Sequence, residues 1–113
     1  MSGPAIDDVA FAELQQSAGA DFVHELVDTF LEEAPRMLAE LRSAAVTGRS
    51  DAFRRAAHSL KSNANTFGAL TLGSMARELE LNGAPPGGDE AAIDTLAAEY
   101  GRVAARLAEL RGV

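Results

Sequence analysis

The sequence predicts an all-α fold: an antiparallel up-down four-helix bundle with a short extra helix at the N-terminus. Apolar residues make up 47% of the 113 residues, yet aromatic residues make up only 5%. Alanine and leucine, which favour helices, outnumber the β-branched and aromatic residues that favour strands. Apolar residues also recur at intervals of three and four along four long segments, and glycine or proline marks the breaks between them.

The length suits a single domain, residues 1–113, with one hydrophobic core. The initial methionine and the complete set of bundle helices favour a free-standing protein. The N-terminus has neither the basic region nor the apolar stretch of a secretory signal. No stretch approaches the 18 or so apolar residues of a membrane span. We therefore expect a cytoplasmic protein without a membrane segment.

The first half of the chain is expected to hold a short helix and a long one. Residues 6–16 form the short helix, and Gly19 breaks the chain after it. Asp21 is the expected N-cap of the long helix, which ends at Gly48. Pro35 lies inside this segment, where it removes one backbone hydrogen bond. Because the apolar spacing continues unshifted across the proline, we expect one bent helix rather than two.

The second half of the chain is expected to hold three more helices. Ser50 is the expected N-cap of the first of them, which Gly68 closes. The connection after it is short, so the next helix, residues 71–82, should return antiparallel as a hairpin. The Gly-Ala-Pro-Pro-Gly-Gly tract at 83–88 cannot continue a helix and is a loop. Asp89 then caps the last helix.

His58 is the residue that sets this sequence apart from an ordinary bundle. On a helical wheel it lies opposite the apolar face, so its ring should point to solvent. Its neighbours at i+3 and i+4 are Lys61 and Ser62. Lys61 is the single lysine of the chain, and a mobile ammonium suits a group that handles an anion such as phosphoryl. Ser62 is small and leaves the ring open to a partner.

Basic residues are expected near His58 although the net charge of the chain is −7. Arg49, Arg54, Arg55 and Lys61 form a small basic patch on an acidic body. Nearby cations disfavour imidazolium and would keep the ring neutral and nucleophilic. Such a patch suits docking to an acidic protein surface, whereas the acidic balance disfavours nucleic-acid binding. A solvated charged face is the ordinary alternative, which the central histidine makes less attractive.

These residues together resemble the signature of histidine phosphotransfer (HPt) domains. The resemblance rests on His58-Ser59-Leu60-Lys61-Ser62, Ala64, Phe67-Gly68-Ala69 and Leu79-Glu80. The motif covers about a quarter of the chain, and the predicted helices are compatible with the family fold over nearly all of it. One departure concerns Ser62, because many members of the family have glycine there. Serine is also small, so access to the ring should survive, but its hydroxyl could alter partner choice.

The resemblance implies a phosphorelay function. His58 would accept a phosphoryl group, through its exposed Nε2, from an aspartyl phosphate on one receiver domain and donate it to an aspartate on another. Lys61 would neutralise charge on the moving group. The implied partner-binding residues are Arg54, Arg55, Ser62, Asn65 and Gly68. Implied partners are response regulator receiver domains and a hybrid sensor histidine kinase, with this chain a monomer. No cofactor or metal is expected here, because Mg²⁺ belongs to the receiver.

Other chemistries find little support in the sequence. The chain has no cysteine and only two histidines, so a structural zinc site is implausible. It has no Gly-x-x-x-x-Gly-Lys-Ser/Thr loop, so we expect no ATP-dependent kinase activity of its own. Two alternatives remain. One is an HPt-like interaction module that binds receiver or kinase domains without transferring phosphate, and the other is an unrelated structural or metal-binding bundle.

Overall fold

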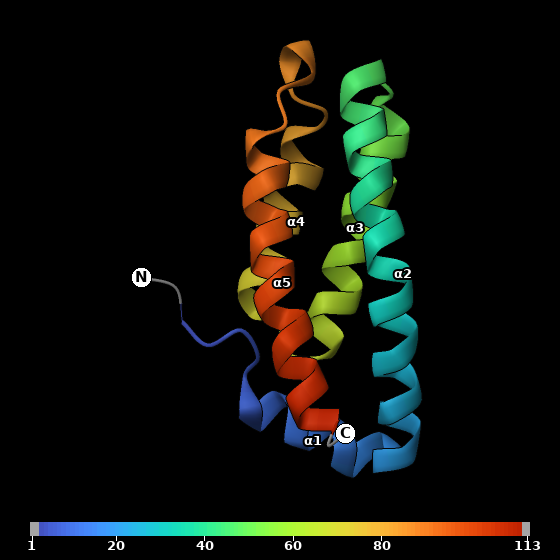
Figure 1. The fold of residues 1–113 in the computed structure, drawn as a ribbon, viewed down its shortest axis with the longest axis vertical. Helices are drawn as coiled ribbons and strands as arrows, with labels where there is room; N and C mark the ends of the chain where they lie inside the picture. Colours follow the sequence, from blue (N-terminus) through green and yellow to red (C-terminus); the bar gives the residue numbers. More distant parts are fainter. Residues whose placement is uncertain (1–2, 112–113) are drawn as a thin grey trace.

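Five α-helices and one 3₁₀ turn make up residues 3–111, the part of the chain that the computed structural model describes (Figure 1). In chain order they are α1 (Asp8–Ala18), α2 (Ala20–Thr47), α3 (Ser50–Thr66), α4 (Leu70–Asn82), the 3₁₀ turn η1 (Pro86–Gly88) and α5 (Ala91–Arg111). Helices α2 to α5 lie along the long axis of the molecule, and α1 crosses one end of the bundle. The all-α prediction is confirmed, since this range contains no strand.

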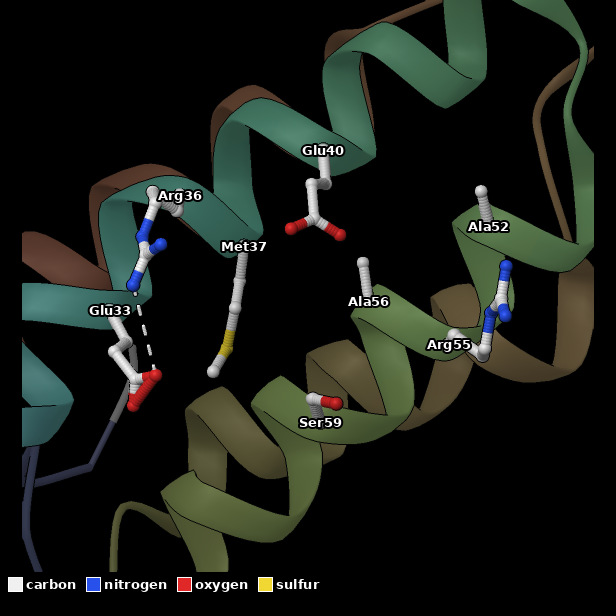
Figure 2. A pocket seen from close by; sticks show the side chains of 8 residues that line it. All are labelled: Glu33, Arg36, Met37, Glu40, Ala52, Arg55, Ala56 and Ser59. Atoms are coloured by element: carbon white, nitrogen blue, oxygen red, sulfur yellow. Dashed lines mark ion pairs between the residues drawn. The ribbon is translucent and has the colours of Figure 1, made fainter.

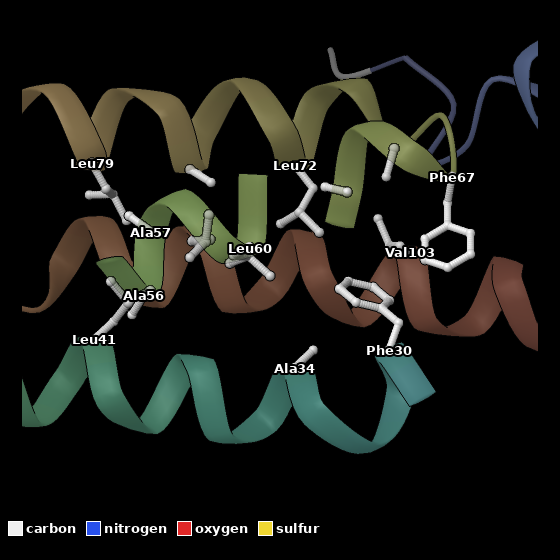
Figure 3. Packing of buried hydrophobic residues seen from close by; sticks show 14 of the residues in the cluster. Phe30, Ala34, Leu41, Ala56, Ala57, Leu60, Phe67, Leu72, Leu79 and Val103 are labelled. Carbon is white, nitrogen blue, oxygen red and sulfur yellow. The ribbon is translucent and has the colours of Figure 1, made fainter. Parts of the chain in front are cut away.

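The core lies between the four long helices, where the apolar stripes meet (Figure 3). Phe30 and Leu41 of α2 face Leu60 of α3, and Leu72 of α4 and Val103 of α5 complete this part of the cluster. All five are at most 2% exposed. Burial of such side chains contributes roughly 1.5–3 kcal/mol each, which is the main force that holds the helices in place.

Helix α2 is continuous across Pro35, as the unshifted apolar spacing predicted. The predicted N-cap at Asp21 is wrong by two residues. Helix α1 runs on to Ala18, so Gly19 alone connects the two helices and is the N-cap of α2. Its φ of 92° lets the chain turn within one residue, which other residues rarely manage. Although α2 has 28 residues, no helix between residues 3 and 111 is long and apolar enough to cross a membrane.

The remaining boundaries differ slightly from those predicted. Helix α1 begins two residues later than predicted, because the Asp7 side chain accepts hydrogen bonds from the amides of Val9 and Ala10 and acts as the N-cap. Ser50 is the first residue of α3 rather than its cap. The Asp89 side chain accepts a hydrogen bond from the amide of Ala91, the first residue of α5, as predicted for a residue that caps this helix.

Helices α3 and α4 form the predicted hairpin and pack closely on each other. Gly68 lies in the turn with φ +79° and is buried, and its carbonyl accepts a hydrogen bond of 2.8 Å from the amide of Asp7. A Cβ added there would lie 2.9 Å from the Ala10 Cβ. The glycine therefore both makes the turn and lets the start of α1 pack against it.

Gly68→Ala is expected to destabilise the fold more than Gly48→Ala. Both glycines have positive φ, so each substitution costs about 1–2 kcal/mol of backbone strain. A Cβ at Gly48 meets nothing within 4 Å, whereas one at Gly68 collides with α1, which costs about 1–3 kcal/mol more. Urea unfolding of the two variants measures the difference. Equal losses would show that α1 does not pack against this turn.

Candidate functional site

His58 is held on the outer face of α3 by the burial of its neighbours. Ala57 and Leu60 are fully buried on the core side of the helix, which fixes the rotation of α3 about its axis. The His58 side chain is 58% exposed as a result. The prediction that this histidine lies outside the core is confirmed.

A single carboxylate joins His58 to Lys61. The Nδ1 atom of His58 lies 2.8 Å from Oε2 of Glu80, and Nζ of Lys61 donates to Oε1 of Glu80 at the same distance. The side chains of Lys61 and Glu80 are only 24% and 25% exposed, so both are partly shielded from water. Glu80 therefore restrains the ring on one side and the ammonium on the other.

Glu80 also determines which nitrogen of the neutral His58 ring carries the proton. The hydrogen bond from Lys61 lowers the pKa of Glu80 below its ordinary value, and the contact with His58 lowers this pKa further against an opposing effect of partial burial. The carboxylate is therefore ionised near neutral pH and can only accept a hydrogen bond. In the neutral ring the proton accordingly lies on Nδ1, which leaves the lone pair on Nε2.

Two of the predicted basic residues, Arg54 and Arg55, lie on different sides of α3. Arg54 lies towards the end of α4, where a Cβ on Gly83 would be 2.9 Å from its Nη2. Arg55 lies on the other side of α3, at a groove of about 350 Å³ between α2 and α3 (Figure 2). Ser59, the residue after His58, also lines this groove. The sequence predicted an environment of cations, but the group that contacts the ring is a carboxylate.

The other predicted partner-binding residues differ in accessibility. Ser62 and Asn65 are exposed on α3, on the side of His58 that leads towards the α3–α4 turn. The Ser62 carbonyl accepts a hydrogen bond from the Thr66 hydroxyl. Gly68 is buried in the turn against α1. Its role is in the fold, so the proposed docking surface does not include it.

Glu80 is the site residue that the sequence reasoning did not assign. It follows the core residue Leu79, and in the signature it had no stated role. Its position could have been estimated from the hairpin, because His58 lies ten residues before Gly68 and Glu80 lies twelve after it. Antiparallel helices of equal rise bring such positions to the same height. Which of the polar residues of α4 faces α3 depends on the rotation of α4, and the sequence alone does not give it.

The site thus combines one exposed imidazole, one ammonium group and one carboxylate. Within residues 3–111, no group of three or more histidine, aspartate or glutamate side chains is placed to hold a metal ion. The arrangement suits an acceptor of a small anionic group, on a surface that a second protein can reach.

Comparisons with known proteins agree with this chemistry. The family model of the Hpt domain matches residues 25–111. Among solved structures, the crystal structure of histidine-containing phosphotransfer protein B (HptB) from Pseudomonas aeruginosa PAO1 is 31% identical to the chain. It matches with a TM-score of 0.84 over 97% of this chain and 96% of that one. No curated protein matches significantly. The chain belongs to the Hpt domain family and has a phosphotransfer role in a phosphorelay.

Proposed function

We propose that His58 carries the phosphoryl group. It accepts the group through Nε2 from an aspartyl phosphate on a response regulator receiver domain and passes it to an aspartate on another. The observation that carries the proposal is the contact of Nδ1 with Glu80, combined with 58% exposure of the side chain. This contact leaves Nε2 as the outer nitrogen of a ring that is already oriented.

The transfer needs no base on this chain. The Nε2 lone pair attacks phosphorus, the bond between phosphorus and the acyl oxygen breaks, and the aspartate leaves as a carboxylate. The proton on Nδ1 stays in place, so the phosphorylated ring carries a positive charge. Glu80, 2.8 Å from Nδ1, balances that charge. The return transfer to an aspartate reverses the same steps.

Lys61 supplies the positive charge for the moving group. Its ammonium is held by Glu80, one helical turn from His58, and can exchange part of this contact for the phosphoryl oxygens. Mg²⁺ is expected on the receiver, where it neutralises charge on the aspartyl phosphate. This chain thus provides the nucleophile, its orientation and the docking surface. We assign it no ATP-dependent kinase activity.

The docking surface is formed around His58 by Arg54, Arg55, Ser62 and Asn65. Its arginines suit an acidic receiver surface around the reactive aspartate. We include a hybrid sensor histidine kinase as the source of phosphate in the pathway, and we place the exchange in the cytoplasm between a monomer of this chain and each partner in turn.

Transfer from a phosphorylated receiver tests the proposal. A purified receiver domain of the same organism is phosphorylated with labelled acetyl phosphate, separated from the reagent, and mixed with this chain in the presence of Mg²⁺. We expect the label to move to this chain and to be labile in acid and stable in alkali. Binding of the receivers without movement of the label would instead identify an interaction module and contradict the proposal.

Glu80→Gln is expected to slow transfer about tenfold, the lower end of the loss found when the group that orients a functional histidine is removed. The amide keeps the shape of the side chain, but it can donate to Nδ1, which favours the tautomer that carries the proton on Nε2. It also cannot balance the charge of the phosphorylated ring. Single-turnover transfer rates measure the effect. Glu78→Gln, an exposed position on the same helix, is the matched control and should transfer like the parent. Equal rates for both variants would remove Glu80 from the mechanism.

The lowered pKa of Glu80 also gives the sign of a pH effect. A carboxyl whose pKa is lower in the folded state stabilises the fold above its ordinary pKa, and this stability is lost as the pH falls through the lower value. Below about pH 4.5, the parent should therefore lose stability more steeply than Glu80→Gln. Thermal unfolding of the two proteins across this range gives the comparison.

A further inference from the structure

Gly73 is a glycine that the backbone of α4 does not require. It lies inside α4 (Leu70–Asn82), where glycine makes a helix less stable than alanine does. Its φ is not among the positive values found at six other glycines of the described chain. Gly73 is nevertheless buried, so another group must cover it.

The amide of Asn65 covers Gly73. A Cβ added to Gly73 would overlap Oδ1 of Asn65 and would lie 2.9 Å from its Cγ and 3.4 Å from its Nδ2. These are the three nearest heavy atoms, so the closest obstacle to a side chain at this position is one flexible amide. The absence of a side chain leaves a notch in α4, in which the end of Asn65 lies. Of the two terminal atoms of the amide, Nδ2 lies farther than Oδ1 from the position of this added Cβ.

Asn65 lies within reach of any protein that docks on His58. It follows His58 by seven residues on α3, which is about two helical turns, so it is on the same face about 10 Å further along. A protein interface buries about 800 Å² on each partner, which corresponds to a disc of about 16 Å radius. A partner centred on His58 therefore covers Asn65.

We propose that Gly73 is a positioning residue for partner recognition: its notch seats the Asn65 amide so that Nδ2 faces an acceptor oxygen on the docked receiver. The inference rests on the proposed docking at His58 and extends it to a residue that touches neither the phosphoryl group nor the partner. It also accounts for a glycine that weakens its helix, because alanine would displace the amide from the docking surface.

The test compares four variants in receiver-to-chain transfer, with KM for the phosphorylated receiver and kcat measured separately. Gly73→Ala is expected to raise KM roughly threefold to tenfold, the value of one lost hydrogen bond, with kcat unchanged. Its unfolding midpoint should equal or exceed that of the parent. Asn65→Ala should raise KM equally, and the double variant no further, because both changes remove one contact. Gly101→Ala is the matched control: this helical glycine is exposed, and a Cβ there meets nothing within 4 Å.

Three results would overturn the proposal. The first is a KM for Gly73→Ala equal to that of the parent, and the second is an additive increase of KM in the double variant. The third is recovery of the parent KM in the double variant, because the displaced Asn65 side chain would then be an obstacle to docking and not a contact. Labelling with phosphoramidate, a small donor that needs no docking partner, should be the same in Gly73→Ala, in Gly101→Ala and in the parent. A parent chain that takes no label from any receiver would instead contradict the proposed function, so the two failures are distinguishable.

Discussion

Replacement of His58 by glutamine is expected to abolish phosphoryl transfer completely. Glutamine has no nitrogen lone pair that can attack phosphorus, and none of the neighbouring side chains can take over this step. The fold should persist, because the His58 side chain is 58% exposed and glutamine is a good helix former. The measurement is transfer of label from a phosphorylated receiver, with circular dichroism to verify folding.

His24→Gln is the control for this substitution. His24 is the second histidine of the chain; it lies on α2 and is only partly exposed. We expect this variant to take label at the parent rate. Label that remains in folded His58→Gln protein, or disappears in His24→Gln protein, would assign the acceptor to another residue.

Ser62→Gln is expected to reduce transfer on the order of 100-fold, a loss typical of a reacting group held about 1 Å out of place. Ser62 is exposed one turn from His58, so a long side chain there stands between the ring and the arriving receiver. The rate of transfer from the receiver is measured together with the unfolding midpoint, which should not change.

Ser43→Gln is the matched control for Ser62→Gln. Ser43 is also an exposed helical serine, and its carbonyl likewise accepts a hydrogen bond from a threonine four residues later, Thr47. It lies on α2 and not on α3, and we expect this variant to leave transfer unchanged. If Ser62→Gln folds and transfers as well as Ser43→Gln, the receiver does not approach over Ser62.

Features of the fold that depend on the residues of a single helix could be predicted from the sequence. The apolar spacing identified each long helix, including the continuity of α2 across Pro35, because burial of one face decides whether a segment is helical. The outward direction of His58 followed from the same spacing. The ends of helices were less predictable: Gly19 replaced Asp21 as the N-cap because the length of α1 left a single residue for the connection.

The contacts between helices could not be predicted in the same way. Glu80 meets His58, and Asn65 meets Gly73, only because α3 and α4 have a particular relative rotation and height. That arrangement results from the packing of all the buried side chains together, including the turn at Gly68 and its contact with α1. The sequence therefore indicated His58 and Lys61, but not the carboxylate that contacts both.

The position of the phosphoryl group on the His58 ring decides whether Glu80 has the role proposed here. The phosphorylated protein, labelled with ¹⁵N in its histidines, can be studied by ¹H–¹⁵N and ³¹P NMR in alkaline solution, where phosphohistidine is stable. We expect one phosphohistidine, at His58, with phosphorus bonded to Nε2 and the proton on Nδ1, where Glu80 accepts it. Phosphorus on Nδ1 of His58, or on any other residue, would contradict the role assigned to Glu80 and with it the proposed mechanism.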